Sequence, residues 1–502
     1  MVIAVLPLMF INACVRHLLR RMAEQILVIK SFFLQGSFPL GSMPYYSYLL
    51  LTMSYLQQKY IIMSKLIQFE EIHAHGAGID VGAREIFVSI DGKQVVSFKT
   101  FTEDYYRCCH YLKENGITEV AMESTGVYWM SLYSILEDSG IKVCLVHPRE
   151  TQQVKGRKSD VKDSQWIQKL FSAGLLRESI VAEGALKELR MLVRERLDLI
   201  EMGSTYINKM QKYLELMNIK LKNVISQIHG ISGLRVIKSI IDGERDEEKL
   251  LALCDIRIRR QKAEEVKKSL RGNYTPQYLM LLEENLHLWE VHECSIAKIE
   301  KEIEKLLDRM CVEKPDIPVN TPSKPSRHHN PNIKDLHGKM VRLYGGVDLT
   351  TIAGINDVTM LRLLGETGSD LSRFPTVKHF VSWLGLSAKN KQSGKMKKRV
   401  QSKSNKAGEI FRQSAQSLSI SKHNAIGAFI RRLKGRKGAP IAIKAGARKI
   451  AQAYYNAITK GMDYVEHGVN KYMEQLKMRE LYALTKIAKK YNYIITQNQT
   501  IT

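Results

Sequence analysis

The feature that most constrains the fold of this chain is an alternation of short apolar runs and helical patterns between residues 64 and 180. Acidic residues stand where these elements meet. Asp80 lies in Gly-Ile-Asp-Val-Gly, just before an alternating strand pattern, and Glu123 ends a short apolar run. Asp160 and Asp163 open a helical pattern that follows another strand pattern. This alternation predicts a layered α/β sheet with acids at the ends of its elements.

The spacing of the apolar residues predicts where the individual strands and helices lie. Ala77–Ile90 and Gln94–Phe101 are predicted to form a hairpin that turns at Asp91-Gly92, a favoured turn dipeptide. The remaining predicted elements are helices at Asp104–Asn115, at Val127–Ser139 and from Asp160 to about Ala173, and strands at Glu119–Met122 and Ile141–Val146.

Four carboxylates, those of Asp80, Glu123, Asp160 and Asp163, are the candidate metal ligands and catalytic residues of this region. Acids three residues apart on a helix share a face, so the last two can be directed at one point. Carboxylate oxygens suit hard divalent cations, and we expect Mg²⁺ with Mn²⁺ as a substitute. The alternative is that these acids are ordinary helix caps and surface charges.

The net charge of the chain indicates a polyanionic partner. Its 76 Lys and Arg residues exceed its 51 Asp and Glu residues, giving a formal charge of +25. Such an excess is typical of nucleic-acid-binding proteins. The alternative is a basic protein without such a partner.

The charge is concentrated between Ser387 and Ile450, which contain 18 Lys or Arg residues and one acidic residue, Glu409. A solvated face normally mixes both signs, so phosphate contact is the favoured interpretation, and binding should weaken with salt. The candidate nucleic-acid-binding residues are Lys389, Lys391, Lys395, Lys397, Lys398, Arg399, Lys403 and Arg412.

Ser393 stands inside this basic segment, in Gln392-Ser-Gly. A serine is a poor nucleophile unless a base or a metal helps to remove its proton and positive charge stabilises the transition state. Lys391, Lys395 and a carboxylate-bound cation could supply that help. Taken alone, a Ser-Gly pair in a polar loop is more typical of a turn.

The rest of the chain divides by composition. Residues 181–312 are helical and highly charged, which favours a coiled coil or helical arm that pairs with another subunit, with a monomeric helical bundle as the alternative. Residues 313–342, rich in proline, are predicted to be a linker. Residues 343–470 form a second, mostly helical domain, and 471–502 form a tail.

A turn near Gly354 and the N-terminal segment each allow two interpretations. Leu349–Asn356 and the helical pattern after it resemble a helix–hairpin–helix, in which Gly354 allows a turn that either meets a phosphate or is only structural. Residues 1–62 are predicted to be an upstream extension outside the native chain. Membrane anchoring is the alternative, but the apolar run Val2–Val15 is too short to span a bilayer.

Taken together, the motifs resemble the DEDD-type transposases of insertion sequence family 110. The resemblance runs from Met63 to about Lys460, and the order and spacing of its motifs are specific. The motifs are Gly78-Ile-Asp-Val-Gly, Ala121-Met-Glu-Ser-Thr-Gly, His147-Pro, Lys158-Ser-Asp-Val-Lys-Asp, Gly230-Ile-Ser-Gly, Thr351-Ile-Ala-Gly-Ile, Arg373-Phe-Pro, Trp383-Leu-Gly-Leu and Gln392-Ser-Gly. Ala353, Asn356 and Ala388 depart from the family pattern, which has Pro, Gly and Pro there.

The resemblance implies a ribonuclease-H/resolvase-like N-terminal domain whose metal-binding quartet is Asp80, Glu123, Asp160 and Asp163. It also implies that Ser393 attacks a DNA strand and forms a phosphoserine link. Double-stranded DNA, a structured guide RNA from the element, and further copies of the chain in a homodimer or homotetramer are the implied partners. A cytoplasmic, nucleoid-associated prokaryotic protein without a membrane segment is expected.

Two other functions fit the same residues. A resolvase-like endonuclease would hydrolyse branched DNA with a metal-activated water, and would need the four acids but neither Ser393 nor the basic segment. A decayed element would leave a protein that binds nucleic acid without cutting it. A covalent protein–DNA adduct separates the transposase from both.

Overall fold

The computed structural model describes residues 71–151, 160–319, 321–326, 328–387, 389–393, 396–400, 404–421 and 424–493. They belong to two compact units that divide between Ile180 and Val181. The expected upstream extension, residues 1–62, lies outside the described residues. All six cysteines within the described ranges are unpaired.

None of the described helices is both long enough and apolar enough to cross a membrane.

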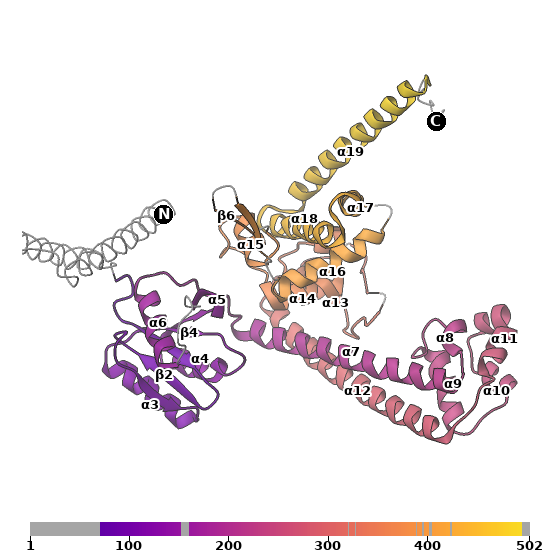
Figure 1. The fold of residues 1–502 in the computed structure, drawn as a ribbon, viewed down its shortest axis with the longest axis horizontal. Coiled ribbons are helices and arrows are strands. Elements are labelled where there is room, and N and C mark those ends of the chain that lie inside the picture. Colours follow the sequence, from indigo (N-terminus) through magenta and orange to yellow (C-terminus); the bar gives the residue numbers. More distant parts are fainter. Residues whose placement is uncertain are drawn as a thin grey trace, which may run out of the picture. The chain divides into compact units, whose positions relative to one another are not determined.

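The first unit is built around a five-stranded sheet in the order β3-β2-β1-β4-β5 (Figure 1). Its strands are β1 (Gly76–Val81), β2 (Glu85–Ser89), β3 (Val96–Lys99), β4 (Glu119–Glu123) and β5 (Lys142–Val146). The first three strands pair antiparallel, whereas β4 is parallel to both β1 and β5. Its helices are α3 (Thr102–Glu114), α4 (Trp129–Asp138), α5 (Pro148–Thr151) and α6 (Asp160–Ser172). The expected α/β fold of this region is confirmed.

One predicted element was wrong in its extent. The range Ala77–Ile90, expected as one arm of a hairpin, contains two antiparallel strands that separate at Gly82, whose N–H donates to the Glu85 carbonyl at 3.0 Å. The turn at Asp91-Gly92 is present and joins β2 to β3, with Gly92 at φ +68°. The strand pattern continues across a tight turn, so its period alone did not reveal the break.

Helix α6 lies unusually close to the central strand β1. A Cβ atom added at Gly78 would be 2.3 Å from the backbone nitrogen of Gln168 and 2.5 Å from the carbonyl oxygen of Ser164. On the neighbouring strand, Ala121 packs with Ile167 and Phe171 of the same helix. Because Gly78 has no side chain and Ala121 has only a methyl group, α6 packs directly on the sheet at these two residues.

The second unit begins with a long pair of helices, α7 (Gly184–Leu216) and α12 (Pro276–Val312), which pack side by side (Figure 1). Four shorter helices occupy the far end of this pair: α8 (Leu221–Val224), α9 (Ile231–Ile241), α10 (Glu247–Ala252) and α11 (Ile256–Leu270). Their apolar side chains, among them Val236, Ile237 and Leu250, form one core cluster with Met210 and Leu282 of the long helices.

The remainder of the second unit is a mostly helical module. Its elements are α13 (Leu336–Leu343), the 3₁₀ turn η1 (Leu349–Thr351), α14 (Asp357–Thr367), α15 (Val377–Trp383), β6 (Lys389–Ser393), β7 (Met396–Val400), α16 (Lys406–Ile420), α17 (Ala425–Lys437), α18 (Ala439–Lys460) and α19 (Met462–Lys490). Phe380, Phe411 and Tyr454 are fully buried at its centre, with ring centroids 5.5–6.3 Å apart. Burial raises the pKa of Tyr454 to about 12, so its hydroxyl stays protonated.

Two arginines hold α7 against α14. Arg190 donates from Nε to the carbonyl of Gly365 at 2.8 Å and from a terminal nitrogen to that of Glu366 at 2.9 Å. One turn further on, Arg194 forms a bidentate pair with the Glu366 carboxylate, with both bonds 2.7 Å long. The bonds from Arg190 satisfy carbonyls at the end of α14 that the helix itself leaves unpaired, and those from Arg194 form a charge-assisted pair with a side chain of the same helix.

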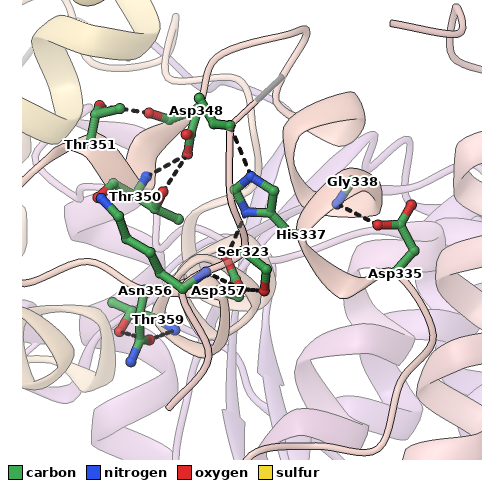
Figure 2. A network of polar contacts seen from close by, with 12 residues as sticks. Ser323, Asp335, His337, Gly338, Asp348, Thr350, Thr351, Asn356, Asp357 and Thr359 are labelled. Carbon is green, nitrogen blue, oxygen red and sulfur yellow. Dashed lines mark hydrogen bonds and ion pairs between the residues drawn. The ribbon is translucent and has the colours of Figure 1, made fainter. Parts of the chain in front are cut away.

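The proline-rich segment before α13 is held at both ends, although no helix or strand is found in its described residues. At one end, the buried pair Arg196–Glu300, with Nε and Oε1 2.8 Å apart, also bonds to the backbone of His329 and Asn332. At the other end, Asp357 accepts from the Ser323 hydroxyl at 2.7 Å (Figure 2). The segment therefore connects the long helices to the module.

Asp357 belongs to a buried polar network shown in Figure 2. Its Oδ1 is 2.7 Å from Nδ1 of His337, whose Nε2 is 3.0 Å from the hydroxyl of Thr321. Burial opposes ionisation of the nearby Asp348, but hydrogen bonds from Thr350 and Thr321 and the charge of His337 hold its pKa below the usual range. The network joins η1, α13 and α14 to the proline-rich segment.

The predicted helix–hairpin–helix differs in detail from expectation. Its first helix is only the 3₁₀ turn η1, and Gly354 has φ +87° in the turn before α14. A Cβ atom there would lie 3.0 Å from the side chain of Leu418 and 3.3 Å from Ser414 of α16. The turn is thus packed against another helix, which favours a structural role for Gly354 over contact with a phosphate.

Replacing Gly78 by alanine should destabilise the first unit by about 1–3 kcal/mol, because the new methyl group meets backbone atoms that cannot rotate away. Urea unfolding followed by circular dichroism measures this change. Gly435→Ala is the control, since nothing lies within 4 Å of a Cβ atom at that helical position, and it should stabilise by about 0.5–1 kcal/mol. An unchanged midpoint for Gly78→Ala would contradict the close packing of α6.

Replacing Asp357 by alanine should lower the free energy of unfolding of the second unit by about 3 kcal/mol, because it leaves a buried imidazole without its carboxylate. Asp316→Ala is the control. That carboxylate is 93% exposed and pairs with Arg342 at 3.4 Å, so its loss should change stability by less than about 0.5 kcal/mol. Equal effects of the two variants in urea unfolding would show that the network adds nothing to stability.

Candidate metal centre and basic hairpin

Asp80 and Glu123 lie at the carboxyl ends of two adjacent parallel strands. In the pairing of β1 with β4, Gly78 is opposite Ala121, and continuing that register by two residues places Asp80 opposite Glu123. Side chains two residues apart on a strand share a face. Both acids therefore lie on the face that α6 covers, just beyond the two small residues that receive the helix.

Asp160 and Asp163 come from the first turn of α6. The close approach of this helix to β1 brings its first turn to the end of the strand. One carboxylate oxygen from each of Asp80, Asp160 and Asp163 lies within 4.8 Å of the others. Asp80 and Asp163 are half-buried, and Asp160 is exposed. In the described part of the chain, this is the group of acids that could hold a metal ion.

Glu123 is not a member of that group of three, and its carboxylate is engaged by two threonines. Oε1 accepts a hydrogen bond from the Thr125 hydroxyl at 2.8 Å, and Oε2 accepts one from the Thr151 hydroxyl of α5. The structure thus brings three of the four expected ligands together and places the fourth on the adjacent strand, oriented by hydroxyl groups.

The donor set determines which ions this centre can hold. All of its ligand atoms are carboxylate oxygens, which fit Mg²⁺ or Mn²⁺ and offer no sulfur or imidazole for a softer metal. Three carboxylates so close together repel one another. The positive end of the α6 dipole offsets part of this repulsion, and a bound divalent cation would offset more.

Sequence reasoning missed the residues that support this site. Gly78 was noted only as part of a motif, although its lack of a side chain sets the position of α6. Thr151 follows His147-Pro by three residues and reaches Glu123 across the end of the sheet. The position of Gly78, two residues before the candidate ligand Asp80, was a signal that the sequence offered. The contact of Thr151 with Glu123 has no local signal in the sequence.

Ser393 is the last residue of β6, in a hairpin whose strands carry most of the basic residues expected to bind nucleic acid. The two strands pair antiparallel, with Lys391 opposite Lys398, Gln392 opposite Lys397 and Ser393 opposite Met396. Of the other residues predicted there, Lys389 and Arg399 also lie on the strands. Lys395 and Lys403 lie outside the described residues.

Arg412, the last of the predicted nucleic-acid-binding residues, lies on α16 rather than on the hairpin. Its guanidinium forms an ion pair with Glu409 at 2.8 Å, and both side chains are nearly half exposed. An exposed pair of this kind is weak, so Glu409 does not prevent Arg412 from contacting a phosphate.

Comparison with known protein families identifies both regions. Residues 77–219 match a family model described as a transposase, the DEDD transposase of IS110. Residues 348–430 match a second model, described as Transposase IS116/IS110/IS902 family. No curated protein matches the chain. The first match contains Asp80, Glu123, Asp160 and Asp163, and the second contains Ser393.

The two matches occur in the order expected from the sequence motifs. The five-stranded sheet with its acids is the ribonuclease-H-like DEDD domain, and the mostly helical module with the basic hairpin contains the second matched region. The chain therefore belongs to the IS110 family of transposases, enzymes that act on DNA.

Proposed function

We propose that this transposase cleaves and exchanges DNA strands through Ser393, assisted by divalent cations that Asp80, Glu123, Asp160 and Asp163 hold. The observation that carries the proposal is the approach of three carboxylates to within 4.8 Å of one another, at the end of β1 and the start of α6. A cluster of carboxylates that converge on one point is typical of a metal-dependent phosphodiester site.

The roles of the four acids follow from their positions. Asp80, Asp160 and Asp163 would be the principal ligands, because their oxygens already share one focus. Glu123 would complete the set from the adjacent strand, with Thr125 and Thr151 holding its carboxylate in place. When bound, Mg²⁺ would polarise the scissile phosphate and stabilise charge on the leaving oxygen.

Ser393 would supply the nucleophile. Its Oγ loses a proton and forms a bond to phosphorus, while the bond from phosphorus to one strand oxygen breaks and that oxygen gains a proton. A hydroxyl of the exchanged strand then attacks the phosphoserine and releases Ser393. The ester conserves the energy of the broken bond, so strands can be rejoined without another energy source.

The pairing in the hairpin supports contact with a polyanion. Lys391 is directly opposite Lys398 on two strands that form a sheet of their own within the described residues. Like charges opposite one another destabilise a β-ribbon, and an isolated two-stranded hairpin is marginal by itself. A phosphodiester backbone beside Lys389, Lys391, Lys397, Lys398 and Arg399 would remove that repulsion.

We propose further that a structured RNA encoded by the element guides the protein to its DNA, and that the chain acts as a homodimer or homotetramer. The support is the similarity of the motifs to this family and the formal charge of +25, which favours association with nucleic acid. Reactions with and without a transcript of the DNA that flanks the gene test the need for RNA.

The metal ligands can be tested without a DNA substrate. Asp80→Asn and Asp163→Asn should each weaken Mn²⁺ binding, measured by calorimetry, by more than about tenfold, since even residues behind a ligand affect affinity by 10–100-fold. Asp138→Asn, an exposed carboxylate at the end of α4, should bind Mn²⁺ as the unchanged protein does. If all three variants bind equally well, the carboxylate group is not the metal site.

The nucleophile can be tested by trapping the covalent intermediate. With labelled DNA that carries the element's own end and the flanking transcript, the unchanged protein should give an adduct that survives denaturing electrophoresis. Ser393→Ala should give none, whereas Ser404→Ala should leave the adduct in place. An adduct with Ser393→Ala would exclude Ser393 as nucleophile.

The same experiment separates the two alternative functions. Cleaved DNA without any adduct, from the unchanged protein, would indicate hydrolysis by a resolvase-like endonuclease. Binding without cleavage in the presence of Mg²⁺ would indicate a protein that has lost its catalytic activity.

A further inference from the structure

The turn that follows Glu123 exposes an apolar surface at the end of β4. Val127, Tyr128 and Met130 are 67%, 48% and 43% exposed. Single apolar side chains are common on a protein surface, but a group of neighbours marks an interaction site. Residues 124–136 contain no charged side chain. The turn therefore fits a partner that is uncharged where it touches, even though the acids of the candidate metal centre stand at the same end of the sheet.

The main chain of this turn is held at both ends. Ser124 donates its N–H to the carbonyl of Val146, the last residue of β5, at 2.9 Å. The indole N–H of Trp129 donates to the carbonyl of Gly126 at 3.2 Å. The Trp129 ring also meets that of Tyr133 edge-on, with centroids 5.5 Å apart and planes at 86°. Trp129 thus anchors the start of α4, and the residues just before it stay at the surface.

Tyr128 presents an aromatic ring within reach of the carboxylates. Its ring lies beside Gly126, where an added Cβ atom would be 3.6 Å from two ring carbons. Glu123 is five residues earlier, and five residues of fully extended chain span at most about 18 Å. That length is close to the rise of about five nucleotides along one strand of B-form DNA. A strand with a phosphate at the carboxylates can therefore bring one of its next few bases to this ring.

The bases are the part of a DNA strand that matches an uncharged aromatic surface. The phosphates carry the charge of the strand and suit cations, whereas every base has a π-face that stacks on an aromatic side chain whatever its sequence. In a paired duplex these faces are covered by the neighbouring bases. Exchange of strands separates paired bases, so unpaired bases with open faces arise close to the site of cleavage.

We propose that Tyr128, with Val127 beside it, stacks on an unpaired DNA base close to the phosphate that the enzyme cleaves. This inference rests on the proposed function, because it takes the carboxylates to be the place of cleavage. Tyr128 binds and orients the strand and takes no part in breaking or forming bonds. Because stacking does not depend on the identity of the base, the contact adds affinity for open DNA without adding sequence specificity.

Equilibrium binding to the full-length protein tests the contact in EDTA, where no metal-dependent cleavage occurs. Two labelled duplexes are compared, one fully paired and one with an internal run of unpaired thymines. The unchanged protein should prefer the second. Tyr128→Ala should weaken binding of the second by about 5- to 100-fold, the effect of losing one stacked base, and should leave binding of the paired duplex unchanged.

Two further variants separate stacking from a general effect on the protein. Tyr128→Phe keeps the ring and should bind both duplexes as the unchanged protein does. Tyr106→Ala is the matched control, because Tyr106 is 58% exposed on α3, and it should keep the preference for the unpaired run. Mn²⁺ binding by Tyr128→Ala should equal that of the unchanged protein, so loss of stacking is distinguished from loss of the metal site.

Photo-cross-linking locates the base. With 5-iodouracil in place of the unpaired thymines, mass spectrometry should find DNA on the peptide that contains Tyr128, and Tyr128→Ala should lose this product. Equal affinity of Tyr128→Ala and the unchanged protein for the unpaired run would overturn the proposal, as would an equal loss of affinity for both duplexes. Cross-links confined to other peptides would also overturn it and would leave the turn as a surface for a protein partner.

Discussion

The close contact between helix α6 and strand β1 at Gly78 is the constraint on which the chemistry of the first unit depends. Because Gly78 has no side chain, the backbone of α6 packs directly against β1, and the space between them is too small for a methyl group. The first turn of α6 then lies level with the end of β1, and Asp160 and Asp163 meet Asp80. A helix held only a few ångströms further away would leave these acids separated, as ordinary surface charges.

Both regions proposed to be functional concentrate charge of one sign in a small space. Three carboxylates converge at the end of the sheet, and Lys391 is opposite Lys398 in the register of the β6–β7 hairpin. Like charges repel at short range, and a bound counter-charge would reduce that repulsion at each site. We therefore propose a divalent cation at the carboxylates and a phosphate backbone at the hairpin.

The sequence was sufficient to predict the α/β class of the first unit, most of its elements and the helical character of the rest, because apolar period and turn residues are local signals. It did not reveal the break at Gly82, since alternation continues through that turn. The contacts of Arg190 and Arg194 with α14, and of Thr151 with Glu123, join residues far apart in the chain. Such contacts depend on tertiary packing, which no local pattern records.

We propose above all that Asp80, Asp160 and Asp163 hold a divalent cation at the end of the sheet. Anomalous diffraction from crystals grown with Mn²⁺ tests it most directly, because the signal locates the ion without reference to activity. We expect a peak between the three carboxylates, within coordination distance of an oxygen from each. Ordered Mn²⁺ elsewhere in the crystal with no peak at this position would contradict the account.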